Sequence, residues 1–330
     1  FQVIRTIHNV AQLSGRATHV WLVRRKGKYY VLKDSWPLQS KPFSEIRHLL
    51  KINQTILKDP VMRKKLKHKY PVLIVGQEFE DNTGFFRAEL GAKIFPRVHR
   101  RIVTKPIGDP LTSFNSKFEF CKILCDVVEY LKYSSKDCFV CHGDISLKNI
   151  PIGIPYKTTS PNANSLTEPQ TTSDVSSPTA APTTPDVISP AVSTSCDVPV
   201  PISAHGLVID NDNSSVILYL IVCQGTVPFM ALESLQWEDT ADFTHEPRHD
   251  LESLFYVILT ICTYVDSPGC LRSAIPDEDE RSLCLNEWWA TLDGNLLARN
   301  KASHMTSLEH CVLRRLPPYW HDFHKYLIEL

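Results

Sequence analysis

An aspartate and an asparagine five residues apart, Asp144 and Asn149, are the pair best spaced for chemistry in this sequence. They follow His142 in a stretch that comes directly after the apolar residues 139–141, which predicts a short strand feeding a loop. In such a loop an aspartate can accept the proton of an incoming hydroxyl, and an asparagine oxygen can reach a magnesium ion on a nucleotide. The alternative is an ordinary turn, because both residue types bond their own backbone in turns. The spacing indicates phosphoryl transfer, and the rest of the chain decides between the two.

Three charged residues stand in the order that this chemistry needs. Lys33 ends a predicted strand, where a lysine could grip the α- and β-phosphates of a nucleotide. Glu45 opens the next predicted helix and could pair with Lys33. Asp210 follows the apolar residues 207–209, another predicted strand, and would complete a magnesium site beside Asn149. Taken singly, Lys33 also fits a solvated lysine at a strand end, and one glutamate on one helix is weak evidence.

The composition is that of an ordinary globular protein. The chain has 330 residues, 43% apolar and 22% charged, which suffices for one large domain or two lobes. Lysine plus arginine balance aspartate plus glutamate at 36 each, so no nucleic acid or membrane partner is expected. The basic run at residues 63–69 is expected to be an exposed loop. The longest apolar runs are too short to span a bilayer, and the opening Phe1 suggests a segment of a longer protein.

The ten cysteines show no paired spacing that would predict a disulfide framework. Cys138 and Cys141 form a CxxC, but no second pair stands at zinc-finger distance. Cys121, Cys125 and Cys262 fall in apolar helical patterns, where a free cysteine behaves as a small buried hydrophobe. This usage predicts a reducing, intracellular location, cytoplasmic or nuclear.

The first hundred residues must hold Lys33 and Glu45, and they are expected to be β-rich with one helix. Residues 18–23 and 28–33 flank a basic turn ending in Gly27, which predicts a hairpin. Residues 43–57 place apolar side chains at spacings of three and four, which predicts an amphipathic helix with Ser44 near its start. Residues 71–75 and 101–104 are further predicted strands.

After Gly108 the pattern becomes helical. An apolar stripe predicts one long helix, and its members are Phe114, Phe118, Cys121, Leu124, Cys125, Val128 and Leu131. Residues 250–265 are apolar nearly all round and predict a buried helix, and helical patterns continue at 286–298 and at the C-terminal end. The fold class that follows is α+β, with a small β-rich N-lobe (residues 1–105) and a larger helical C-lobe (residues 106–154 and 204–330).

Residues 155–203 interrupt the C-lobe. They are dominated by serine, threonine, proline, alanine and asparagine, with almost no aromatic residues. Such a composition cannot bury enough apolar surface to offset its ordering entropy, so a disordered insert is expected. A phosphorylated regulatory segment and retained non-coding sequence are the other interpretations.

Four motifs together resemble a known family. They are Cys141-His-Gly-Asp-Ile-Ser146, Gly206-Leu-Val-Ile-Asp210, Gly225-Thr-Val-Pro-Phe-Met-Ala231 and His249-Asp-Leu-Glu-Ser-Leu-Phe-Tyr-Val257. With Val31-Leu-Lys-Asp-Ser-Trp36 and Gly108-Asp-Pro-Leu111, they make the chain similar to the fungal-type protein kinase domain family from about Gly15 to Val265. The resemblance implies a bilobal kinase fold, binding of ATP with Mg2+, and transfer of phosphate to serine or threonine of a protein substrate.

The resemblance also implies residue roles. Asp144 would be the catalytic base, with Lys33 and Asn149 as the other catalytic residues. Asn149 and Asp210 would hold Mg2+. The residues at the nucleotide would be Gly15, Lys33 and Glu45.

Three further positions carry expectations from the same resemblance. Glu233 matches the structural glutamate at the end of an activation segment, and Asp250 matches the aspartate that anchors the backbone of the catalytic loop. Gly143 replaces the arginine of the common His-Arg-Asp motif. Because that arginine usually reads a phosphate on the activation segment, dependence on such phosphorylation is not expected.

Several positions depart from the kinase pattern. Residues 13–18 keep one glycine, Gly15, where the common loop has three, and side chains there obstruct the approach of backbone amides to phosphates. Asp210-Asn-Asp212 stands where Asp-Phe-Gly is usual, and residues 216–223 are unusually apolar for an activation segment. Pro151 and Pro155 disfavour the short strand expected there. A pseudokinase that acts as a binding module is therefore one alternative.

A small-molecule kinase of the aminoglycoside or choline type is the other alternative. Its motif also reads His-Gly-Asp with an asparagine five residues on, and Ile-Asp-x-Asp resembles its metal site. Residues 225–233 and the helix at Asp250 favour a protein kinase instead. Ser146 and Lys148 leave the acceptor residue open, so serine/threonine specificity rests on the resemblance alone.

Overall fold

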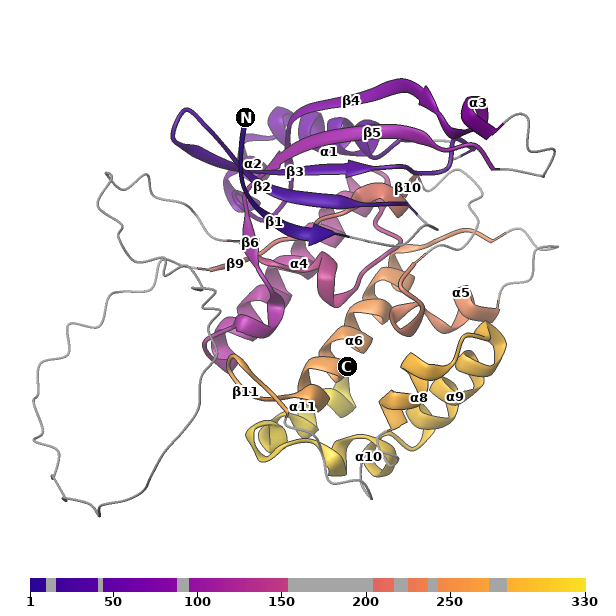
Figure 1. The fold of residues 1–330 in the computed structure, drawn as a ribbon. Coiled ribbons are helices and arrows are strands. Elements are labelled where there is room, and N and C mark those ends of the chain that lie inside the picture. The colour runs from indigo at the N-terminus through magenta and orange to yellow at the C-terminus, as the bar shows by residue number, and fades with distance from the viewer. Residues whose placement is uncertain are drawn as a thin grey trace, which may run out of the picture.

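The computed structural model describes residues 1–9, 16–40, 44–87, 95–153, 204–216, 225–236, 243–272 and 284–330. Within these ranges an N-terminal β-sheet precedes a largely helical region, as Figure 1 shows. The predicted α+β arrangement of a β-rich part followed by a helical part is therefore confirmed. Three predictions fall outside the described residues: Gly15 with its glycine-poor loop, the insert 155–203, and residues 217–223 of the apolar segment.

The N-terminal region is a five-stranded antiparallel sheet in the order β1-β2-β3-β5-β4. Its strands are β1 (Gln2–Asn9), β2 (His19–Arg25), β3 (Lys28–Ser35), β4 (Val72–Asn82) and β5 (Val98–Lys105). The predicted hairpin is confirmed as β2 and β3, and its turn residues Lys26 and Gly27 both have positive φ. Lys33 pairs with Val20 on β2 and Ile102 on β5, which places it on the central strand.

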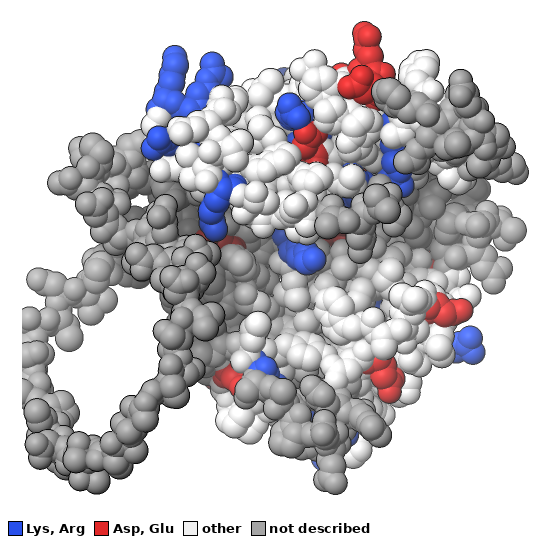
Figure 2. Space-filling view, viewed as in Figure 1, with Lys and Arg blue, Asp and Glu red and all other residues white. Residues whose placement is uncertain are grey.

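Charged side chains are mostly interspersed on the face shown in Figure 2. Basic side chains project from the end of the β2–β3 hairpin, where Arg24, Arg25, Lys26 and Lys28 are exposed. Acidic and basic residues are scattered over the rest of the described surface in this view. This pattern agrees with the equal numbers of the two charges in the sequence.

Helix α1 (Glu45–Lys58) lies against the sheet and holds Glu45 in its first turn. Ser44 begins the helix, because its hydroxyl accepts a bond from the Arg47 amide at 3.3 Å. A Cβ on Gly76 of β4 would lie 2.9 Å from the Ile46 side chain, so glycine permits this close packing. The predicted helix is confirmed, and its position against the sheet fixes Glu45 relative to β3.

The exposed loop predicted at residues 63–69 is right in part: Arg63, Lys64, Lys65 and Lys67 are exposed, but the run is not a loop throughout. Residues 63–65 end the short helix α2 (Pro60–Lys65), and Leu66 is fully buried. Lys69 pairs with Asp126 at 2.7 Å and with Glu129 at 2.9 Å. These contacts with helix α4 draw the run onto the helical region. A second short helix, α3 (Thr83–Arg87), follows β4.

The helical region is built around α4 (Lys117–Lys136) and α6 (Pro247–Tyr264). Helix α6 is buried over most of its surface, as predicted. Around these two lie α5 (Leu232–Gln236), α8 (Cys284–Ala290), α9 (Gly294–Thr306), α10 (Leu308–Cys311) and α11 (His324–Glu329). The pattern at 286–298 corresponds to α8 and α9, which residues 291–293 separate. No helix in the described ranges is long and apolar enough to cross a membrane.

The buried stripe of α4 differs from the predicted one. Phe120, Ile123, Val127 and Tyr130 are buried, whereas Phe118 is 80% exposed. Two predicted stripe members, Cys121 and Cys125, are also exposed, although Cys262 is buried as expected. Apolar residues occur on both faces of this helix, so helical spacing alone does not select the face that packs on α6.

Short strands frame the loops of the helical region. β6 (Gly108–Asp109), β8 (Ile152–Gly153) and β9 (His205–Gly206) form one sheet, and β7 (Val140–Cys141) pairs with β10 (Ser215–Val216). β11 (Val265–Ser267) pairs with β12 (Cys270–Leu271). The expectation that Pro151 disfavours a strand is wrong, because the proline precedes β8 and its carbonyl accepts from the Leu207 amide. The strand predicted at 207–209 is wrong as well, since the paired residues lie just before it.

Candidate active site

The loop that carries Asp144 is hydrogen-bonded to helix α6 through Asp250. Both carboxylate oxygens of Asp250 accept backbone bonds, from His142 N at 2.7 Å and from Gly143 N at 2.9 Å. Gly143 has φ +77°, and a Cβ there would lie 2.5 Å from the Asn213 carbonyl oxygen. Glycine therefore fits this position for two reasons, a left-handed backbone and a lack of space. The predicted anchoring contact of Asp250 is present.

Burial raises the pKa of Asp250, but neighbouring groups, His245 first among them, lower this pKa by more. His245 Nε2 lies 3.0 Å from the Asp250 carboxylate, and its charge and hydrogen bond, together with His142 and the Gly143 amide, hold that pKa below its usual value. The His142 side chain points the other way, and its Nε2 donates to the Ile209 carbonyl at 2.9 Å. The loop is thus tied both to α6 and to the segment that leads into Asp210.

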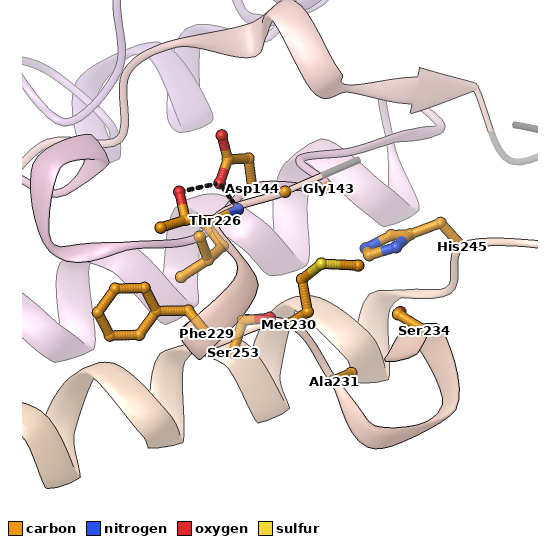
Figure 3. Close-up of a pocket in the computed structure, with 11 residues that line it drawn as sticks. Gly143, Asp144, Thr226, Phe229, Met230, Ala231, Ser234, His245 and Ser253 are labelled. Atoms are coloured by element: carbon orange, nitrogen blue, oxygen red, sulfur yellow. Dashed lines mark hydrogen bonds between the residues drawn. The ribbon is translucent and has the colours of Figure 1, made fainter. Parts of the chain in front are cut away.

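Asp144 lies at the edge of a small pocket formed with residues 225–234, as Figure 3 shows. Its Oδ1 accepts from the backbone N–H and the hydroxyl of Thr226, both at 2.8 Å. Its Oδ2 accepts from Asn213 Nδ2 at 3.1 Å. Three donors thus fix the orientation of this carboxylate. Phe229, Met230 and Ala231 contribute apolar side chains to the lining of this pocket.

Asn149 and Asp210 are brought together across the 61 positions that separate them in the sequence. The Ile209 amide donates to the Asn149 carbonyl at 2.9 Å, so the residue before Asp210 is hydrogen-bonded to Asn149. The Asn149 side chain donates its Nδ2 to the Asp144 carbonyl at 2.9 Å. That bond uses the amide nitrogen and leaves the amide oxygen as the atom suited to a cation.

Lys33 joins the two regions. Its Nζ lies 2.9 Å from Glu45 Oε2 on α1 and 2.5 Å from Asp210 Oδ1. Burial lowers the pKa of Lys33, but the carboxylates of Asp210 and Glu45 raise it by more, so the ammonium stays charged. Burial raises the pKa of Glu45, and the pKa of Asp210 lies below its usual value because Lys33 and Arg16 outweigh the effect of burial.

The residues of the site fit a magnesium ion bound with a nucleotide. Among the residues that the structure describes, no group of three or more His, Cys, Asp and Glu could hold a metal by itself. Magnesium does not need such a group, because it is usually bound by one or two carboxylates together with phosphate oxygens. Asp210 supplies a carboxylate and Asn149 an amide oxygen. This donor set suits a metal that arrives with phosphates.

Three residues of the site were not predicted from the sequence. Asp212 has a fully buried side chain whose Oδ2 lies 2.8 Å from Arg16 Nη1 and whose Oδ1 lies 2.6 Å from Arg100 Nη1. Arg100 also pairs with Glu78 at 2.9 Å. The Asp-x-Asp spacing was the available signal for Asp212. The arginines carried no signal, because they lie 196 and 112 positions from their partner.

The end of the predicted activation segment is pinned to α6. Glu233 Oε2 accepts from His249 Nε2 at 2.9 Å and lies 2.7 Å from Arg248 Nη2. A hydrogen bond from His249 lowers the pKa of Glu233 although burial acts the other way. Helix α9 adds a second tie, since Lys301 Nζ donates to the Met230 carbonyl at 2.7 Å. Residues 225–236 are therefore held beside Asp144 from two sides.

A sequence model of the fungal protein kinase family matches residues 1–90 and 62–262. No curated protein matches the chain. Among solved structures, the chain is similar to PK-1, the kinase of Cydia pomonella granulovirus, with 12% identity and a TM-score of 0.44. That similarity covers 79% of this chain and 70% of the viral one.

Proposed function

Because the chain belongs to the fungal protein kinase family, we propose that it transfers the γ-phosphate of Mg-ATP to a protein hydroxyl, that of serine or threonine. The observation that carries the proposal is the arrangement at Asp210. Lys33 reaches this carboxylate from the sheet, and Asn149 is bonded to the residue before it. A phosphate clamp, a metal-ligand pair and the candidate base Asp144 thus gather where the sheet meets the helical region, and the cleft that we propose for the nucleotide lies among them. Phosphoryl transfer needs little more than such positioning and charge neutralisation.

In this mechanism Asp144 orients the acceptor hydroxyl and takes its proton as the oxygen bonds to the γ-phosphorus. The bond from that phosphorus to the bridging oxygen breaks, and ADP leaves. Lys33 holds the α- and β-phosphates, and Glu45 keeps Lys33 in place. Asp210 and Asn149 would hold Mg2+, which neutralises charge on the phosphates. Thr226 and Asn213 keep the Asp144 carboxylate turned toward the pocket.

Two contacts support a protein acceptor over a small-molecule acceptor. Glu233 is bonded to α6, which fixes residues 225–236 as a wall beside Asp144 that an extended peptide could lie along. Asp212, the second aspartate of Ile-Asp-x-Asp, is buried between Arg16 and Arg100. It is therefore poorly placed to act as the second metal ligand that a small-molecule kinase of the aminoglycoside type would use. Serine or threonine as acceptor rests on family membership.

The test is transfer of label from γ-labelled ATP with Mg2+ to two acceptor panels, dephosphorylated cell proteins and small alcohols that include choline and an aminoglycoside. We expect label on protein serine or threonine, and at least a hundredfold less with Lys33→Met or Asp210→Ala. Lys28→Ala, an exposed lysine on the same strand, is the matched control and should label normally. Label on the small alcohols alone would contradict the protein acceptor. Stabilisation by Mg-ATP without any transfer would identify a pseudokinase.

A further inference from the structure

Arg16 lies in the β1–β2 connection, three residues before β2 begins at His19, and its side chain reaches the candidate active site. The backbone around it is held in a bent conformation. The Arg16 carbonyl accepts from the Trp36 amide at 2.7 Å, and His19 Nδ1 bonds the Ala17 carbonyl at 3.1 Å. Ala17 has φ +43°, a left-handed conformation that is unfavourable for a residue other than glycine. The turn that directs Arg16 inward is therefore maintained against a local cost.

The guanidinium of Arg16 stands among the carboxylates of the site. Its Nη1 lies 2.8 Å from Asp212 Oδ2 and 3.9 Å from Asp210 Oδ1, the same oxygen that Lys33 contacts. The charge of Asp144 acts on it as well. Arg16 thus lies beside the candidate metal ligand Asp210, where the phosphates of a bound nucleotide must lie if the proposed function is correct.

The charges around Arg16 show that Asp212 does not depend on it. Asp212 already has a buried partner in Arg100, whose side chain is 3% exposed and 2.6 Å away. Lys33 likewise compensates Glu45. The side chain of Arg16 differs from those of Arg100 and Lys33, because 33% of it is exposed. A guanidinium carries five N–H donors, and the ion pairs of Arg16 within the described residues use Nη1. The remaining edge can meet a ligand in the cleft.

The scarcity of glycine before Arg16 also suggests why a guanidinium would bind phosphate here. The common kinase loop contacts phosphates through backbone amides, which three glycines expose. The sequence before Arg16 has one glycine, Gly15, where the common loop has three. An arginine binds phosphate with a planar pair of donors and stays charged at every physiological pH.

We propose that Arg16 binds the phosphate chain of the nucleotide and replaces, with its guanidinium, contacts that a glycine-rich loop makes with backbone amides. This inference rests on the proposed function, because it assumes that ATP occupies the cleft. The competing explanation is a purely structural tie between β2 and Asp212. Loss of a structural tie would weaken the binding of every ligand of the cleft equally. Loss of a phosphate contact would weaken the binding of ligands that carry phosphates and leave adenosine unaffected.

The test measures binding of Mg-ATP, ADP, AMP and adenosine by calorimetry, with thermal unfolding of each ligand-free variant as a check on folding. Arg16→Ala should weaken the binding of Mg-ATP about tenfold, which corresponds to the loss of one charged contact, and should leave the affinity for adenosine within about twofold of wild type. Arg16→Lys keeps a charge beside Asp212 and preserves the fold, but it should recover only part of the ATP affinity because lysine lacks the planar fork. Arg24→Ala, an exposed arginine on β2 bonded to Gln2, is the matched control and should bind all four ligands normally.

The outcomes separate this inference from the proposed function. Equal losses for adenosine and ATP in both Arg16 variants would show a structural tie and overturn the inference, and so would unchanged ATP affinity. In either case the wild-type protein would still bind ATP, and the proposed function would stand. A wild-type protein that binds neither ATP nor adenosine would overturn both.

Discussion

Replacing Asp250 with asparagine tests how the catalytic loop is held. The aspartate accepts two buried backbone bonds, from His142 and Gly143, and pairs with His245. Asparagine keeps one acceptor oxygen and turns an NH2 group toward the second amide, which loses its partner. A buried donor without a partner costs about 1 to 3 kcal/mol, and the surviving bond loses its charge, which removes about 1 kcal/mol more. Asp250→Asn should therefore lower the free energy of unfolding by about 2 to 4 kcal/mol.

The assay is urea unfolding at pH 7 followed by tryptophan fluorescence. The matched control is Asp322→Asn, since Asp322 pairs with Lys117 but has a side chain that is 66% exposed. Exposed pairs contribute less than about 1 kcal/mol, so this variant should unfold nearly as the wild type does. Equal, small losses in both variants would refute the reasoning, because they would mean that the loop does not need the Asp250 carboxylate.

The stability difference between wild type and Asp250→Asn should also depend on pH. The pKa of Asp250 lies below its usual value, so the stability it adds is present above the unfolded-state pKa of about 4 and is lost as pH falls through the folded value. The difference in stability between wild type and Asp250→Asn should shrink as pH falls below about 4, because the carboxylate is then protonated. A difference that stays constant down to pH 2 would contradict the ionised role of this carboxylate.

Two further substitutions have outcomes fixed by local geometry. Gly143→Ala places a Cβ 2.5 Å from the Asn213 carbonyl oxygen in a left-handed backbone. In urea unfolding it should lower the free energy of unfolding by at least about 2 kcal/mol more than Gly269→Ala, because Gly269 has a similar φ but open space around it. Equal losses of stability in the two variants would contradict the clash. Burial lowers the pKa of Lys301 to about 7 despite the attraction of Glu252. Because the unfolded lysine titrates at about 10, the stability of the wild type relative to Lys301→Met should rise by up to about 1.4 kcal/mol per pH unit from pH 7 to 9. A difference that does not change with pH would contradict this prediction.

The parts of the site that could be predicted are those that one short motif carries. Asp144 and Asn149 are five residues apart and share one loop, so their spacing alone suggested joint chemistry. Lys33 and Asp210 each end an apolar segment, and the order of the motifs along the chain predicted that they meet. Their distance of 2.5 Å shows that this juxtaposition occurs, while their catalytic roles stay predictions.

The parts that could not be predicted depend on long-range contacts. Arg16 and Arg100 meet Asp212 only after the sheet docks on the segment 204–216, and nothing near either arginine marks it. The buried face of α4 is likewise chosen by its neighbours, because both faces of this helix carry apolar residues. Strand β1 escaped prediction since its side chains are exposed along its whole length, which removes the alternation that marks a half-buried strand.

The most direct test of the central claim is a paired measurement on Asp144→Asn. Asparagine keeps the size of the side chain but cannot take the proton of the acceptor hydroxyl, and Asp144 is not a proposed ligand of the nucleotide or the metal. We expect phosphate transfer from Mg-ATP to protein to fall at least a hundredfold, while the affinity for Mg-ATP measured by calorimetry stays within about threefold of wild type. Transfer at the wild-type rate would contradict the assignment of Asp144 as the base on which the proposed kinase activity depends.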